Sequence, residues 1–167
     1  MEKGEQPKEW QRLLHRFLSL APVSRFLKYT AHRVDGWVYR LSGGQASVTA
    51  MGAGLPVVML TTVGARTGKS RTAPLVGIPD GDKIVLIASN FGGKNHPAWY
   101  FNLCAHPEAT VSMNGKTRGY MARPAEGKER ERYWQKAVDL YAGYAAYKER
   151  AQGREIPVMV LTPKTEE

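Results

Sequence analysis

The sequence predicts an α+β protein that is mainly β, in which six mostly antiparallel strands form a small closed barrel with helices at its periphery. Two observations predict this fold. Strand-like apolar runs recur from residue 57 onward, and turn residues or short helical stretches separate them. The expected strands cover residues 57–63, 71–79, 83–89, 108–113, 116–123 and 156–161. A chain of 167 residues that is 43% hydrophobic and 23% charged is typical of one globular domain.

Residues 1–50 are expected to form a helical arm and a loop before the barrel. Apolar side chains recur at helical spacing over residues 7–20, at Trp10, Leu13, Leu14, Phe17 and Leu18. A second short helix is expected over residues 24–39, and the Gly- and Ser-rich residues 42–55 should form a loop. The apolar face of the first helix covers its own domain and active site, a second subunit or a membrane surface, and the sequence leaves these alternatives open.

The first expected hairpin turns at residues 64–70, which read Gly-Ala-Arg-Thr-Gly-Lys-Ser. This segment is one residue short of a nucleotide-binding P-loop, because only three residues separate Gly64 from Gly68. Pro74 and Pro79 follow, which suits an edge strand better than the helix that a P-loop requires. The segment therefore predicts a strand, a basic glycine turn with features of an anion site, and a second strand. A solvated hairpin tip is the alternative.

The later elements follow from turn signals and periodicity. Residues 80–82 form a tight turn, after which the apolar run at 83–89 is expected to be a central strand. A second glycine-bearing loop is expected at residues 90–95, and then a helix over 97–105 with Pro97 as its first residue.

The chain after this helix predicts a hairpin, a helix and a last strand. Asn114-Gly115 is a strong hairpin signal between the fourth and fifth strands. A helix is expected from residue 125 to about 141, and Tyr141, Tyr144 and Tyr147 continue at a three-residue spacing before the sixth strand.

The composition favours an anionic partner. Lys and Arg number 24 against 15 acidic residues, so the formal charge is 24 − 15 = +9. This charge predicts attraction to a phosphorylated cofactor, nucleic acid or an anionic membrane. We expect a cytoplasmic protein, with membrane association through the first helix left open, because the N-terminus is polar and no apolar run is long enough to span a membrane. The single cysteine, Cys104, excludes an internal disulfide and is expected in the core.

Several kinds of chemistry are poorly supported. The four histidines lack ligand-like spacing, so no metal site is expected. No nucleophile elbow is present, and the acidic residues cluster on solvated helix faces. The remaining groups suit a flat, anionic cofactor: a basic glycine turn, a second glycine loop, and the aromatic residues Trp99 and Tyr100. Both aromatic residues are alternatively core anchors.

Motifs that recur in order resemble the deazaflavin-dependent nitroreductase family. They are Leu60 to Arg71 with Pro74-Leu75, Ala88-Ser89, Gly92-Gly93, Pro97 to Leu103 with Pro107, Tyr141 to Tyr147, and Ile156-Pro157-Val158. The resemblance spans residues 55–163. It implies a split β-barrel over residues 51–167, related to the flavin-binding pyridoxamine-phosphate oxidases, and use of reduced coenzyme F420.

The resemblance also implies roles for single residues. Those expected to hold the cofactor's phosphate and oligoglutamate tail are Arg66, Thr67, Gly68, Lys69 and Arg71. Those expected to border the ring are Pro74, Ala88, Ser89, Gly92 and Gly93, and those shaping the pocket wall are Trp99, Tyr100 and Asn102. Ser89 would orient the ring and Tyr144 would donate a proton, although Tyr144 is alternatively a residue that packs its helix on the barrel. Asn90 and Phe91 depart from relatives that have Lys and Gly there.

The expected function is hydride transfer from the reduced deazaflavin to an electron-poor acceptor, such as an activated alkene, an enone, a quinone or a nitro compound. An FMN-dependent split-barrel reductase and a non-catalytic F420 carrier are the alternatives. Nucleic-acid binding is disfavoured because most aromatic residues lie in expected helices, away from a basic strand face. The sequence identifies neither the physiological substrate nor whether the protein is a monomer or a homodimer.

Overall fold

The computed structural model describes residues 54–165. The strands are β1 (Val57–Val63), β2 (Ser70–Asp80), β3 (Lys83–Ile87), β4 (Glu108–Met113), β5 (Lys116–Pro124) and β6 (Val158–Pro163). The helices are the short 3₁₀ turn η1 (Asn90–Gly92), α4 (Ala98–Ala105), α5 (Gly127–Leu140) and α6 (Gly143–Arg150). The helices expected over residues 7–20 and 24–39, and the loop expected over 42–55 except for its last two residues, lie outside the described residues.

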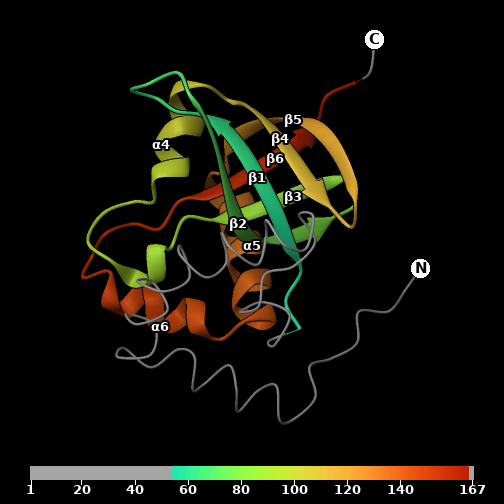
Figure 1. Ribbon diagram of the computed structural model, residues 1–167. Coiled ribbons are helices and arrows are strands. Elements are labelled where there is room, and N and C mark those ends of the chain that lie inside the picture. The colour runs from blue at the N-terminus through green and yellow to red at the C-terminus, as the bar shows by residue number, and fades with distance from the viewer. Residues whose placement is uncertain (1–53, 166–167) are drawn as a thin grey trace.

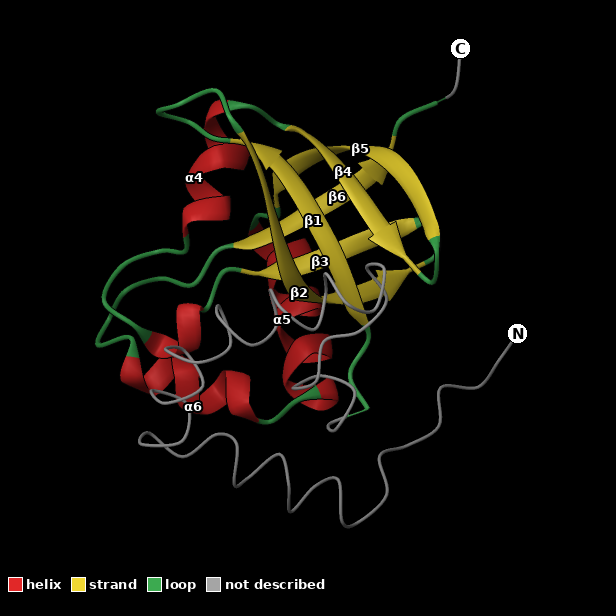
Figure 2. Cartoon of the chain, in the orientation of Figure 1, coloured by secondary structure: helices red, strands yellow, loops and turns green. Residues whose placement is uncertain are grey.

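The six strands close into one antiparallel barrel in the order β1-β2-β3-β6-β5-β4 (Figures 1 and 2). Every neighbouring pair is antiparallel, and β4 closes the barrel by pairing with β1. The fold class predicted from the sequence is therefore confirmed. None of the helices in residues 54–165 is both long and apolar enough to cross a membrane.

Strand β3 is buried on both faces, which explains its uninterrupted apolar sequence. Ile84 and Leu86 belong to the cluster of buried residues that also holds Leu161 of β6 and Trp99 of α4. The alternate residues, such as Val85, belong to a second cluster formed with the tyrosines of α5 and α6. Because successive side chains of a strand point to opposite faces, one strand joins the two cores.

Strand β2 changes partner halfway along its length. Residues 70–76 pair with β1 and residues 77–80 pair with β3, so the first half has no strand on its second side within the described residues. Gly77 stands at the change, where an added Cβ would lie 2.5 Å from a methyl carbon of Val58. Its amide donates to the carbonyl of Pro56, so by alternation the nitrogen of Pro74 faces away from β1. The proline thus lies on an open edge, as the sequence predicted.

The helices lie at two sites on the barrel. Helix α4 lies against the end where β1 turns into β2, and α5 and α6 lie together on another side (Figure 1). The helical stretch expected to run to about residue 141 ends at Leu140, since Tyr141 has extended backbone angles, and α6 starts at Gly143. Cys104 is exposed on α4, so the expectation of a core cysteine was wrong.

Candidate functional site

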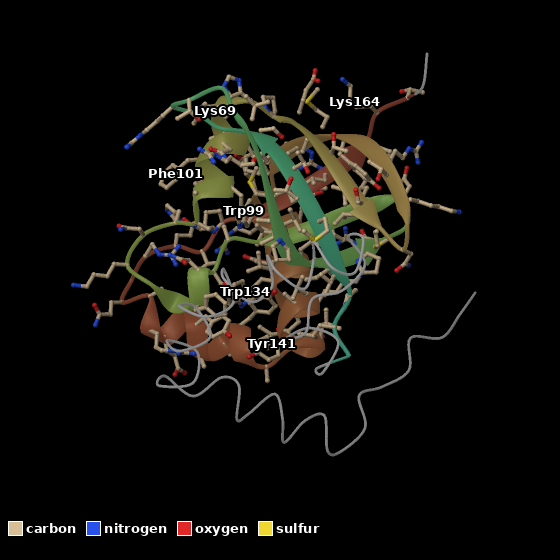
Figure 3. The ribbon with its side chains drawn as sticks, viewed as in Figure 1. Lys69, Trp99, Phe101, Trp134, Tyr141 and Lys164 are labelled. Atoms are coloured by element: carbon tan, nitrogen blue, oxygen red, sulfur yellow. The ribbon has the colours of Figure 1, made fainter. Side chains whose placement is uncertain are left out.

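The basic glycine turn at residues 64–69 is closed by its own backbone. The amide of Gly64 donates to the carbonyl of Lys69 over 2.9 Å, and the amide of Gly68 donates to the carbonyl of Gly64 over 2.8 Å. Gly68 has φ = +64°, which favours glycine. Arg66, Lys69 and Arg71 are exposed, and Figure 3 shows Lys69 near the end of the barrel where α4 lies. The turn and the start of β2 therefore present three exposed cations.

Asn102 joins this turn to α4. Its Oδ1 accepts a hydrogen bond of 3.0 Å from the amide of Ala65, and its Nδ2 donates over 3.0 Å to Oγ1 of Thr62. Asn102 is 8% exposed. Asn102, which was expected in the pocket wall, thus uses its carboxamide to hold the basic turn.

The loop after β3 has an unusual backbone. Asn90, Phe91 and Gly92 have φ of 47°, 56° and 75°, so three successive residues are left-handed. At Gly92 an added Cβ would lie 2.7 Å from the carbonyl oxygen of Tyr147, so the loop packs directly on α6. The rings of Phe91 and Tyr147 meet edge to face with centroids 5.8 Å apart. The loop of residues 90–93 and helix α6 are therefore neighbours.

Arg154, in the segment between α6 and β6, holds the other side of this loop. Its guanidinium donates to the carbonyl of Ser89 over 2.7 Å, to that of Gly93 over 3.0 Å and to that of Ala88 over 3.4 Å. It also lies 2.8 Å from Nδ1 of His96. Since an arginine has no acceptor, Nδ1 must accept this bond, and a neutral His96 carries its proton on Nε2. Burial lowers the pKa of His96, and the charge of Arg154 lowers it further.

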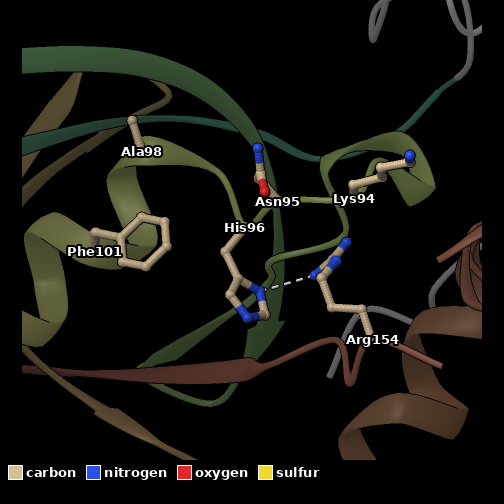
Figure 4. Close-up of a pocket in the computed structure, with 6 residues that line it drawn as sticks. All are labelled: Lys94, Asn95, His96, Ala98, Phe101 and Arg154. Atoms are coloured by element: carbon tan, nitrogen blue, oxygen red, sulfur yellow. Dashed lines mark hydrogen bonds between the residues drawn. The ribbon is translucent and has the colours of Figure 1, made fainter. Parts of the chain in front are cut away.

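A pocket of about 570 Å³ opens beside the loop. Its described lining residues are Lys94, Asn95, His96, Ala98, Phe101 and Arg154. Figure 4 shows His96 between Arg154 and Phe101, with the hydrogen bond to Arg154 as a dashed line. Phe101 is 50% exposed and contributes an apolar surface.

Tyr144 lies in a cluster of aromatic rings. Its centroid is 5.6 Å from that of Tyr141 and 6.0 Å from that of Tyr147, and Trp134 of α5 is 6.5 Å away. The hydroxyls of Tyr141 and Tyr147 are 3.2 Å apart. Burial raises the pKa of Tyr144 well above its usual value, so its phenol keeps its proton at neutral pH. The protonated phenol of Tyr144 could donate a hydrogen bond or a proton. Its exposure of only 5% is typical of a residue that packs in the protein interior.

The expected site residues fall into three groups. Arg66, Thr67, Gly68, Lys69 and Arg71 lie together on the β1–β2 turn and the start of β2, and Pro74 lies further along the same open edge. Ala88, Ser89, Gly92 and Gly93 lie in the loop held by Arg154 and α6. Trp99 belongs to the buried barrel core, while Tyr100 packs against that core and contacts His96 at 4.9 Å between ring centroids.

Sequence reasoning missed three residues of this region. Arg154 was not singled out, His96 was considered only as a metal ligand, and Phe101 was not assigned a role. Arg154 and His96 are 58 positions apart, and they meet because β3 and β6 pair antiparallel with Ile87 opposite Val158. The pairing of these two strands would have been the signal, since it places residues after β3 beside residues before β6.

Comparisons with known proteins show which family the chain resembles. Residues 31–163 match the family described as F420H(2)-dependent quinone reductase. An F420H(2)-dependent quinone reductase of Mycobacterium tuberculosis strain H37Rv is 35% identical over 133 residues, which is 78% of this chain and 88% of that protein.

Two solved structures are similar in fold and sequence. An F420-H2 dependent reductase is 40% identical with a TM-score of 0.59, covering 64% of this chain and 93% of that one. A structure described as a domain-swapped dimer has the same identity and TM-score and covers 64% of this chain and 79% of the other. The family is one of oxidoreductases named for reduced F420, which confirms the cofactor class predicted from the sequence. The chain belongs to the F420H(2)-dependent quinone reductase family.

Proposed function

We propose that this protein transfers a hydride from reduced F420 to a quinone, with the cofactor's phosphate and oligoglutamate tail held at the turn of residues 64–69. The observation that carries the proposal is this turn, which presents Arg66 and Lys69 to solvent from a backbone closed by two hydrogen bonds and held by Asn102. The name of the family and of its M. tuberculosis member supports quinones as the acceptor class.

The open edge of β2 supports a continuous binding track. Residues 70–76 follow the basic turn and pair with β1 only, so within the described residues no strand lies on their other side. The nitrogen of Pro74 faces that open side. An elongated cofactor with an anionic end and a flat ring needs an anion site joined to an apolar, planar site. The turn supplies the first, and the loop of Ala88 to Gly93 supplies the second.

The chain's own part in the reaction is positioning and electrostatics. When bound, the reduced deazaflavin supplies a hydride, and a quinone that accepts it also needs one proton to become a hydroquinone. Arg154 and α6 keep the loop of residues 88–93 in one conformation, which fixes whatever docks on it. Tyr144 keeps its phenol protonated but is 5% exposed and does not line the pocket beside this loop, so the proton that completes the hydroquinone comes from water.

The proposal is tested by fluorescence titration with F420 and by quinone turnover. Arg66→Ala and Lys69→Ala should each raise the Kd for F420 roughly five-fold, because each removes one exposed charge-assisted contact of about 1 kcal/mol. Lys116→Ala is the matched control. It removes an exposed cation from the β4–β5 hairpin at the opposite end of β1, and it should leave the Kd unchanged.

Two results would reject the proposal. Equal Kd values for wild type and both turn variants would show that the phosphate and tail bind elsewhere. Absence of quinone reduction by wild type with reduced F420 would remove quinones as acceptors.

A further inference from the structure

We infer that the pocket beside the glycine loop is the quinone site, in which His96 donates a hydrogen bond from Nε2 to a quinone carbonyl and Arg154 is the positioning residue that fixes this tautomer. This inference rests on the proposed function and adds to it the residue that recognises the acceptor.

The position of the pocket carries the first step. Lys94, Asn95 and His96 directly follow the loop proposed to dock the cofactor ring, and Arg154 contacts both the loop and the pocket. Hydride transfer requires the acceptor to lie within contact distance of the ring. A cavity of about 570 Å³ that borders the ring-docking loop meets this requirement and has the size of a small-molecule site.

The chemistry of the lining carries the second step. The charged groups that line it in the described part of the chain are the cations of Lys94 and Arg154, and no carboxylate is among them. Phe101 and Ala98 supply an apolar wall. Such a lining suits a flat apolar molecule that bears acceptor oxygens, and the cations favour the negative charge that an oxygen of the quinone gains when the hydride arrives. A quinone has both features.

The hydrogen bonds of His96 carry the third step. Nδ1 is taken by Arg154, and Nε2 has no hydrogen bond within the described residues, so the ring presents one N–H of defined position. The ring is held from the side by Tyr100, whose centroid is 4.9 Å away, and by Phe101 at 5.9 Å. A donor fixed in both tautomer and orientation selects a carbonyl oxygen rather than an apolar group.

The experiment compares three variants with wild type in the full chain, with menadione as the quinone. His96→Phe keeps an aromatic ring but loses the donor, and it should raise the KM for menadione roughly five- to ten-fold, the change expected for one hydrogen bond. The Kd for F420 should stay within about two-fold, because the bond is made to the acceptor. His96→Gln restores an N–H donor and should recover most of the loss. His106→Phe, the same change at an exposed position, should match wild type.

A spectroscopic readout tests the role of Arg154 without turnover. Long-range ¹H–¹⁵N spectra of the free protein should show the proton of His96 on Nε2 and none on Nδ1. Arg154→Lys keeps the charge but loses the fork that reaches Nδ1 and the carbonyls, so the spectrum should show a mixture of tautomers.

Each contrary result has its own meaning. A wild-type KM in His96→Phe, with wild type active on menadione, would overturn this inference and leave the proposed function standing. An increase in the Kd for F420 in place of the KM would assign the pocket to the cofactor and also overturn it. A proton on Nδ1 in wild type would overturn the role of Arg154. Inactivity of wild type on quinones would reject the proposed function and this inference with it.

Discussion

At the scale of single residues, the described site depends on side chains that hydrogen-bond the backbone of the segments expected to contact the cofactor. Asn102 holds the basic turn and Arg154 holds the glycine loop, each through hydrogen bonds to backbone atoms. Backbone groups that lose such partners in a buried place cost free energy, so these contacts order the segments they reach.

Asn102→Ala should loosen the turn even when no cofactor is present. The change leaves the amide of Ala65 and the hydroxyl of Thr62 without their partner, at a cost of about 1–3 kcal/mol. Limited trypsin digestion of the free protein should therefore cut faster after Arg66 and Lys69.

Thr62→Val is the companion variant, because it removes only one of the two contacts and should accelerate cleavage less. Cleavage rates at the turn that equal those of wild type in Asn102→Ala would show that the turn is ordered by its own backbone alone.

The sequence predicted the turn between β1 and β2 because a local motif gave the signal, while the roles of its residues toward a cofactor stay predictions. The glycine turn was predicted because its glycines and cations are adjacent in sequence, and its closed backbone is what such a motif requires. The anchoring roles of Asn102 and Arg154 were not predicted. Asn102 contacts Ala65 across 37 positions of sequence, and Arg154 contacts Gly93 across 61 positions. No local sequence pattern encodes such contacts.

At the scale of elements, α5 is attached to the β2–β3 hairpin mainly around the carboxylate of Asp80, and Lys136 also donates to the carbonyl of Pro79 over 2.7 Å. Asp80 accepts a hydrogen bond of 2.7 Å from the hydroxyl of Tyr133 and one of 2.9 Å from Lys136, and Arg132 lies 3.4 Å away. The contact with Lys136 lowers the pKa of Asp80 most, followed by that with Tyr133. Asp80 of the hairpin thus joins three side chains of α5.

Asp80→Asn should lower the free energy of unfolding by about 1–2 kcal/mol at neutral pH, since the partners are partly exposed. The pKa of Asp80 is lower in the folded protein than in the unfolded chain. The stabilisation is therefore complete above the unfolded value of about 4 and is lost as pH falls below it. Urea unfolding at a series of pH values should show the two proteins converging in acid.

Asp82→Asn serves as the control, because Asp82 is exposed on the same hairpin and has no ion pair within the described residues. A difference between wild type and Asp80→Asn that stays constant from neutral to acid pH would contradict the electrostatic explanation.

Element boundaries followed from sequence wherever a turn signal was strong. The hairpins at residues 81–82 and 114–115 lie where they were expected, since glycine in a left-handed conformation occurs at each. The end of α5 was predicted at about residue 141 and lies at Leu140, whereas the tyrosine spacing that follows was not assigned to a separate helix, α6. The ring of Tyr141 packs so closely on Gly143 that an added Cβ would lie 2.2 Å from it, a contact that spacing alone does not reveal.

At the scale of the whole molecule, the charge of +9 predicts a binding equilibrium that depends on salt. Raising the ionic strength from about 0.1 M to about 1 M shortens the Debye length from about 10 Å to about 3 Å. The Kd for F420 should rise several-fold over this range, as measured by fluorescence titration, because phosphate and glutamate charges meet a basic protein.

The deazaflavin riboside, which lacks the phosphate and the tail, is the matched ligand, and its Kd should hardly change with salt. If salt raised the Kd of both ligands equally, the salt effect would not come from attraction between the protein and the charges of the phosphate and the tail.

Among the described residues, the first half of β2 has no strand on one side, and the composition of this stretch bears on solubility. An exposed strand edge is a template on which other chains add and aggregate. The open stretch of β2 begins with polar residues, carries Arg71, and has at Pro74 a position that cannot donate a backbone hydrogen bond. Within the described residues, this edge is therefore a poor partner for a strand of another chain, although one side of it has no neighbouring strand.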